Sequence, residues 1–185
     1  MGNMGFDIWV DADSVPQNLR QIVLKAAARL DAPCFFVADR ILPDVRQYIA
    51  DDTHRLRQIA REAGQTDEQS VKAIKSAVSM VVVESGADSA DDYIVSNARP
   101  GSLCITHDIP LAARLLEKGC TVLDDRGGEY TADDIRARLS DRLVNQELRS
   151  WGVFDRQQGK MGMQVRKAFA DNLDRIITRL VRSEA

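Results

Sequence analysis

Short apolar runs rich in β-branched residues alternate with segments of helical periodicity along most of the chain. This alternation is typical of a parallel sheet whose strands are joined by helices. The apolar runs predict five strands, over residues 6–10, 34–38, 78–83, 103–106 and 121–123. We therefore expect an α/β fold of three layers, in which a central, mostly parallel five-stranded sheet is flanked by helices.

Helical signals fall between these strands and after the last of them. Apolar side chains recur at helical spacing from Leu19 to Leu30, with Ser14 as the expected N-cap of this helix and Pro16 in its first turn. The helix after the fourth strand has the clearest start, because Asp108 can cap it and Pro110 lies just inside it. Two further helices are expected near the C-terminus, over residues 133–148 and 165–181.

The chain of 185 residues has the length of one ordinary domain. Residues 1–150 are expected to form this α/β domain, and residues 151–185 to add a loop and a C-terminal helix packed on it. The segment from Asp51 to Ser76 is strongly charged and has few apolar positions. It indicates a helical insertion of one or two amphipathic helices, which could serve as a lid, as the contact of a homodimer, or as an addition without a function of its own.

Acidic side chains follow three of the predicted strands. Asp11 and Asp13 follow the first strand, Asp88 and Asp91 the third, and Asp108 the fourth. Ligands bind outside the carboxyl ends of parallel strands, so we expect these carboxylates to converge there. Because such carboxylates repel one another unless a cation lies between them, and oxygen ligands suit Mg²⁺ or Mn²⁺, the pattern predicts a divalent metal site.

The acids also have a structural interpretation. Asp88 and Asp108 precede predicted helices and could act as N-caps, worth about 1 kcal/mol each. Asp92 is expected to face solvent. His107 adjoins the predicted site and could contact a phosphate. Motifs for dinucleotides, nucleoside triphosphates and serine hydrolases (GxGxxG, GxxxxGK[ST] and GxSxG) do not occur in the sequence.

Composition restricts the class of protein further. The net charge of −3 provides no general attraction to nucleic acid. The three cysteines lie in apolar runs without CxxC spacing, which favours buried thiols over a zinc site or disulfides. No apolar run approaches the roughly 20 residues that cross a bilayer, and the first residues lack a basic stretch. We therefore expect a cytoplasmic protein without a membrane segment.

Four segments resemble the YaiI/YqxD family of bacterial proteins. They are Ile8-Trp9-Val10-Asp11-Ala12-Asp13 and the stretches 86–91, 105–112 and 126–131. The family is regarded as PIN-like, and PIN domains are typically metal-dependent ribonucleases. The resemblance implies a PIN-like fold in which Asp11, Asp88 or Asp91, and Asp108 stand where PIN acids sit. The chain departs from the family at Val15, where a cysteine is usual, and over residues 157–163.

Three functions follow from these observations. The first is a metal-dependent nuclease or phosphodiesterase that acts on RNA, with Mg²⁺ or Mn²⁺ as cofactor. Its expected catalytic residues are Asp11, Asp91 and Asp108, which bind metal with help from Asp13 and Asp88. The expected substrate-binding residues are Ser14, Thr106, His107 and Arg126.

The two alternatives use the same acids differently. Asp11-Ala12-Asp13-Ser14-Val15 fits the DxDx[TV] pattern of haloacid-dehalogenase-like phosphatases, with Asp11 as nucleophile and Asp13 as acid/base. The other alternative is a non-catalytic RNA-binding or regulatory module, in which the acids cap helices. Whether the chain is an enzyme, a metal-dependent hydrolase, therefore depends on how these side chains are arranged.

Overall fold

The computed structural model of the chain describes residues 5–86, 88–137 and 162–183. Its strands form one wholly parallel sheet in the order β3-β2-β1-β4-β5. The strands are β1 (Ile8–Asp11), β2 (Cys34–Ala38), β3 (Val78–Val82), β4 (Leu103–Ile105) and β5 (Thr121–Leu123). The predicted α/β class and the five-stranded sheet are confirmed, and the sheet is parallel throughout.

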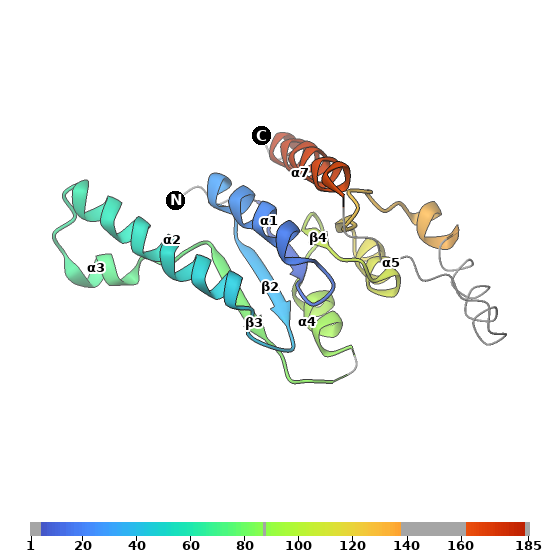
Figure 1. Cartoon of the computed structure of the whole chain (residues 1–185), viewed down its shortest axis with the longest axis horizontal. Helices are drawn as coiled ribbons and strands as arrows, with labels where there is room; N and C mark the ends of the chain where they lie inside the picture. Colours follow the sequence, from blue (N-terminus) through green and yellow to red (C-terminus); the bar gives the residue numbers. More distant parts are fainter. Residues whose placement is uncertain (1–4, 87, 138–161, 184–185) are drawn as a thin grey trace.

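Helices cover both faces of the sheet, which gives the three predicted layers (Figure 1). The helices are α1 (Gln17–Leu30), α2 (Pro43–Glu62), α3 (Glu68–Ala73), α4 (Ser89–Asn97), α5 (Ile109–Glu117) and α7 (Met163–Ser183). Helices α1, α2 and α7 contribute to one apolar core, and α4 and α5 contribute to the other.

The central strand β1 is buried on both faces, as expected for the middle of a doubly covered parallel sheet. Ile8 and Val10 point into the core with α1 and α7, whereas Trp9 points into the core with α4 and α5. This explains why the strand reads as a continuous apolar run rather than an alternating one. Successive side chains of β1 therefore alternate between the two cores. The strand ends at Asp11.

Two predicted helix starts have different outcomes. The Asp108 prediction is confirmed: this residue is the N-cap of α5, and its carboxylate accepts a hydrogen bond from the backbone N–H of Leu111 at 2.9 Å. The Ser14 prediction is wrong, because the N-cap position of α1 is held by Pro16. The chain turns after β1, and the Ser14 hydroxyl donates instead to the backbone oxygen of Asp11.

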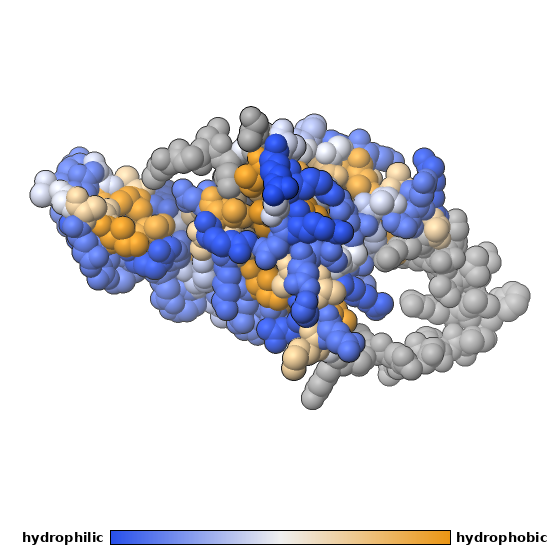
Figure 2. Space-filling model, turned by 90° about the horizontal axis from the view of Figure 1, so that it is seen from above, coloured by the Kyte–Doolittle hydropathy of each residue, from blue (hydrophilic) through white to orange (hydrophobic). Residues whose placement is uncertain are grey.

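The segment expected to be a helical insertion, residues 51–76, does not start at a helix boundary. Asp51 lies in the middle of α2, a single helix of 20 residues. Such a helix is about 30 Å long and overshoots a strand of five residues, so its second half extends beyond the sheet. α3 folds back on it: Arg57 of α2 donates to the backbone oxygens of Ile74 and Lys72, at 3.1 and 2.7 Å. Figure 2 shows a hydrophobic area among hydrophilic residues at this end of the molecule.

The C-terminal helix α7 packs on α1 and completes one core. Phe169, Leu173 and Ile176 are buried there with the side chains of α1. The helix predicted over 133–148 lies mostly outside the described residues, although residues 132–137 are helical. No helix in the described part of the chain is long and apolar enough to span a membrane.

A tight contact at Gly127 joins α7 to the segment after β5 and generates a prediction. Gly127 has a φ of 88°, and a Cβ there would lie 2.7 Å from the backbone nitrogen of Phe169. Gly127→Ala should therefore lower the free energy of unfolding by about 2–4 kcal/mol, because left-handed strain and a backbone clash add together. Gly101→Ala is the matched control, with a φ of 90° and no atom within 4 Å of the added Cβ.

Denaturant unfolding of both variants separates the two costs. Gly101→Ala should lose only the conformational cost, about 1 kcal/mol. Equal losses in the two variants would show that α7 does not hold the position next to Gly127 described above.

Candidate functional site

Acidic side chains from three elements meet at the carboxyl edge of the sheet. Asp11 is the last residue of β1, Asp91 lies in the first turn of α4, and Asp108 caps α5. Burial and, in decreasing order, the charges of Asp11, Asp108 and Asp88 together raise the pKa of Asp91 to about 6. The structure therefore brings Asp91 close enough to three of the other predicted carboxylates to be repelled by each of them.

Asp11 is the most enclosed of these acids, with 5% of its surface exposed. The hydroxyl of Thr106 donates to its Oδ2 at 2.8 Å. Burial raises the pKa of Asp11, while hydrogen bonds from Ser14 and Thr106 lower it. All these donors are neutral, and no basic side chain among the described residues pairs with Asp11. A buried anion without a cationic partner is costly, so the position points to a role beyond packing.

Two hydroxyl groups tie the loops of the site together. Thr106 is fully buried, and its oxygen also accepts from the backbone N–H of Asp108 at 2.9 Å. The Ser14 oxygen accepts from the backbone N–H of His107 at 3.2 Å while its proton goes to the oxygen of Asp11. Ser14 and Thr106 were expected to contact substrate; here they hold the β1–α1 and β4–α5 loops against each other.

Asp13 is the predicted ligand that the structure does not bring into the cluster. One of its oxygens accepts from the backbone N–H of Asp39, and the other pairs with Arg40, both at 2.9 Å. Its charge adds only the smallest of the effects on the pKa of Asp11. Asp13 could join Asp11 only if the chain stayed extended beyond β1, but the chain turns, with the N–H of Val15 donating to the backbone oxygen of Asp11.

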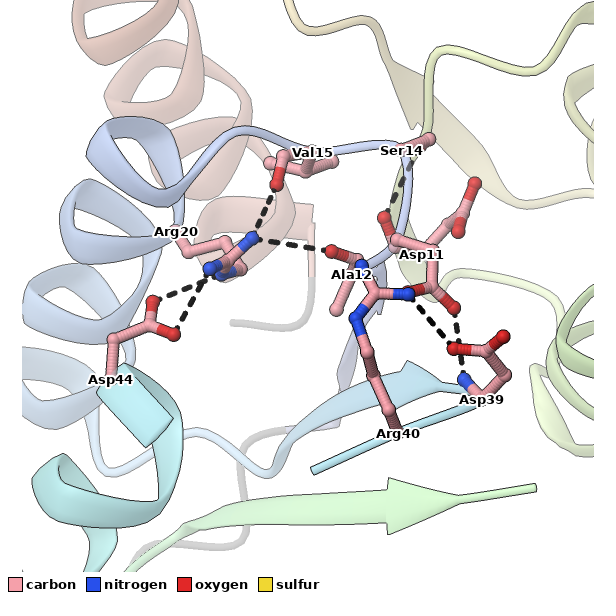
Figure 3. A network of polar contacts seen from close by, with 9 residues as sticks. Asp11, Ala12, Ser14, Val15, Arg20, Asp39, Arg40 and Asp44 are labelled. Carbon is pink, nitrogen blue, oxygen red and sulfur yellow. Dashed lines mark hydrogen bonds and ion pairs between the residues drawn. The ribbon is translucent and has the colours of Figure 1, made fainter. Parts of the chain in front are cut away.

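Arg20 holds this turn in place, as Figure 3 shows. Its guanidinium donates to the backbone oxygens of Ala12 and Val15 at 3.3 and 2.8 Å, and forms a two-pronged ion pair with Asp44 at 3.0 and 2.9 Å. The Arg20 and Asp44 side chains are only 11% and 10% exposed. The loop that carries Asp11 is thus fixed to the first turn of α2, a link that sequence reasoning missed because its ends lie 24 residues apart.

The two remaining acids near α4 are arranged differently. Asp88 precedes the helix with a φ of 61°, a left-handed conformation that is uncommon outside glycine, and its side chain makes no capping bond. Its carboxylate therefore remains available to a ligand. Asp92 turns away and pairs with Arg114 of α5 at 2.6 Å, and it is exposed as the sequence predicted.

A histidine and a buried carboxylate lie beside the acids. His107 Nδ1 lies 2.9 Å from Oδ1 of Asp125, whose side chain is 12% exposed, while the imidazole is 56% exposed. The sequence analysis did not select Asp125. This residue follows β5, so the rule that ligands bind outside the carboxyl ends of parallel strands could have found it. Arg126, a predicted substrate contact, is exposed next to it, and among the described residues no acid forms an ion pair with its side chain.

The donor set suits a hard divalent cation more than a soft one. Asp11, Asp88, Asp91 and Asp108 offer only carboxylate oxygens, the ligands that Mg²⁺ and Mn²⁺ prefer. Within the described ranges, no three His, Cys, Asp or Glu side chains already stand in positions that could hold a metal ion. Binding by these residues therefore requires the partly exposed side chains of α4 to move toward Asp11. One oxygen of Asp108 is already used for its capping bond.

The sequence is similar to a known protein family and to many curated proteins. Residues 64–179 match a family described as "Uncharacterized BCR, YaiI/YqxD family". The UPF0178 protein of Trichlorobacter lovleyi is 37% identical over 175 residues, covering 95% of this chain and 96% of that protein.

Two further relatives have similar coverage. The UPF0178 protein of Myxococcus xanthus is 39% identical over 177 residues, which cover 96% of this chain and 97% of the relative. That of Pseudomonas entomophila is 35% identical over 175 residues, which cover 95% and 98%. No solved structure matches the chain. The family predicted from the segments around Asp11, Asp91 and Asp108 is confirmed, and the chain belongs to the YaiI/YqxD family.

Proposed function

We propose that the protein is a divalent-metal-dependent nuclease or phosphodiesterase that acts on RNA. The observation that carries this proposal is the electrostatic cost at the carboxyl edge. The pKa of Asp91 is raised to about 6 partly by three other carboxylates, and Asp11 is buried without a cationic partner. A divalent cation bound between them would turn this repulsion into attraction.

The residues have distinct roles in this proposal. Asp11, Asp91 and Asp108 hold the ion, and Asp88 completes the set from the start of α4. Held there, such an ion would supply an activated water molecule and would stabilise the leaving oxygen of a phosphodiester. Thr106 orients Asp11 through its hydroxyl, since it donates to Oδ2 at 2.8 Å and is itself fully buried.

The proposal of a nucleic acid substrate rests on the groups around the acids and on the family resemblance. His107 and Arg126 are exposed beside the acidic cluster, where each can meet a phosphate oxygen. Asp125 fixes the imidazole of His107 through Nδ1, so that Nε2 faces outward from this contact. RNA, rather than DNA, is proposed from the resemblance to PIN-like proteins alone.

The phosphatase alternative receives less support from the geometry. That mechanism needs a free acid/base two residues after the nucleophile. Asp13 stands at that position, but Arg40 and the backbone of Asp39 occupy both of its oxygens. The nuclease proposal needs no free carboxylate at Asp13 and is therefore preferred.

Metal binding and RNA cleavage measured together test the proposal. Asp11→Asn and Asp108→Asn should each weaken Mn²⁺ binding at least about tenfold in calorimetry, and should abolish Mn²⁺-dependent cleavage of a mixed single-stranded RNA pool. Asn caps a helix as well as Asp does, so Asp108→Asn should leave α5 intact. Asp92→Asn, which changes a neighbouring acid paired with Arg114, is the control and should bind Mn²⁺ normally.

Two results would contradict the proposal at different points. If none of the variants alters Mn²⁺ affinity, the acids do not form a metal site. If Mn²⁺ binding depends on Asp11 and Asp108 but no RNA is cleaved, the site is not a nuclease centre.

The raised pKa of Asp91 predicts an unusual effect on stability. An acid whose folded pKa lies above its unfolded value weakens the fold when ionised, and this penalty disappears as the pH falls through about 6 toward 4. Asp91→Asn should therefore stabilise the metal-free protein above pH 6, by about 1 kcal/mol after solvent screening, and progressively less at lower pH. Thermal unfolding across this pH range measures the effect, and a loss of stability at pH 7.5 would show that Asp91 is a structural residue.

The pairing of His107 with Asp125 gives a further prediction. Asp125→Asn should lower the rate of RNA cleavage about tenfold or more, because the imidazole loses its orientation, while Mn²⁺ affinity stays unchanged. His107→Ala should have an effect of similar size, and the double variant should be no worse than either single one. Additive losses would show that the two residues act separately.

A further inference from the structure

The two edges of the sheet differ in how their backbone groups are paired. At one edge, β5 is covered by the chain itself: Leu123 forms an antiparallel bridge with Glu129, and the N–H of Tyr130 donates to the oxygen of Val122 at 2.8 Å. At the other edge, β3 pairs with β2 on its inner side, and no segment among the described residues pairs with its outer side. β3 therefore offers a row of backbone groups to another strand.

The composition of this edge does nothing to prevent such pairing. Residues 77–83 read Ala-Val-Ser-Met-Val-Val-Val, without a charge, a proline or a glycine. Val82 near its end is 49% exposed. Proteins usually protect an open edge with lysine, proline or a bulge, because a run of this kind otherwise recruits other chains. The absence of these features suits an edge that is covered in the assembled protein.

The direction of the backbone groups makes β3 complementary to itself. The N–H of Cys34 donates to the oxygen of Ala77, and the N–H of Val83 donates to the oxygen of Ala38, both at 3.0 Å, so odd-numbered residues of β3 face β2. Because backbone groups alternate between the two sides of a strand, Val78, Met80 and Val82 face outward. These three positions are symmetric about Met80. In an antiparallel pair of β3 strands, Met80 therefore lies opposite Met80 and Val78 lies opposite Val82, and each of these pairs can exchange backbone hydrogen bonds.

Charges at the two ends of the strand favour the antiparallel arrangement. Lys75 precedes β3 and Glu84 follows it; both are exposed, and within the described part of the chain neither forms an ion pair. An antiparallel partner brings the lysine end of each strand to the glutamate end of the other. A parallel partner would instead bring like charges together.

We propose that two copies of this chain pair along β3, antiparallel and centred on Met80, to form a homodimer with one continuous ten-stranded sheet (two sheets of five). The two-fold axis runs perpendicular to the sheet, so the interface is the same patch on both copies. The carboxyl edges of the two sheets then face opposite directions. The acidic sites stay separate, and this inference does not depend on what they bind.

Substitutions at Val82 test the interface without disturbing the intramolecular sheet. Its N–H faces outward, so Val82→Pro removes a bond to the second copy and none to β2. Sedimentation equilibrium should give a dimer for the wild type and a monomer for Val82→Pro and for Val82→Lys, with unchanged circular dichroism. Met163→Lys is the control, since this side chain is 86% exposed on α7, away from β3 in Figure 1, and should leave the dimer intact.

A cross-link tests the register directly and needs no loss of folding. In the proposed register Ser79 lies opposite Val81 of the other copy in a non-hydrogen-bonded pair, where Cα atoms are about 4.5 Å apart, within the range of a disulfide. A mixture of Ser79→Cys and Val81→Cys proteins should form a covalent dimer on oxidation, and neither protein should do so alone. The native cysteines are buried and do not compete.

Two results would overturn the proposal. A monomeric wild type overturns the proposal. So does a dimer that persists in both Val82 variants and forms no disulfide between the mixed cysteine proteins, because such a dimer uses another surface.

Discussion

The buried carboxylate of Asp11 is the group around which the carboxyl edge of the sheet is organised. It ends the central strand at a place where water cannot fully solvate it, so neighbouring groups must supply its hydrogen bonds. Thr106 reaches it from the residue directly after β4, and Ser14 from the loop after β1, which fixes both loops relative to β1. These neutral donors do not offset the burial, and the pKa of Asp11 remains raised.

Several features of the same edge weaken the fold rather than support it. Asp88 adopts a left-handed conformation, and Asp91 is forced toward three other carboxylates. The Arg20–Asp44 ion pair, with the two bonds of Arg20 to the oxygens of Ala12 and Val15, holds the loop that follows Asp11. Strain of this kind persists only where the surroundings over-determine it, and it is concentrated at functional sites.

The two proposals concern two different edges of one sheet. The carboxyl edge collects acids because every strand of a parallel sheet ends there. The lateral edge at β3 exposes a row of backbone groups that no described segment pairs with. At the opposite lateral edge, residues 129–130 cover β5. The proposed metal site and the proposed dimer interface therefore use separate parts of the sheet.

The sequence by itself determined the strands, the helix capped by Asp108 and the family, because periodicity, capping and ordered motifs are local patterns. It also indicated which acids follow the strands. Only the tertiary structure decided how those acids are used: Asp13 is taken by Arg40, Ser14 links two loops, and Asp125 joins His107. The sequence also did not predict the length of α2 or the contacts of Arg20 with Ala12, Val15 and Asp44. Each depends on contacts between residues far apart in the chain, and no local pattern encodes a contact whose partner is brought near only by folding.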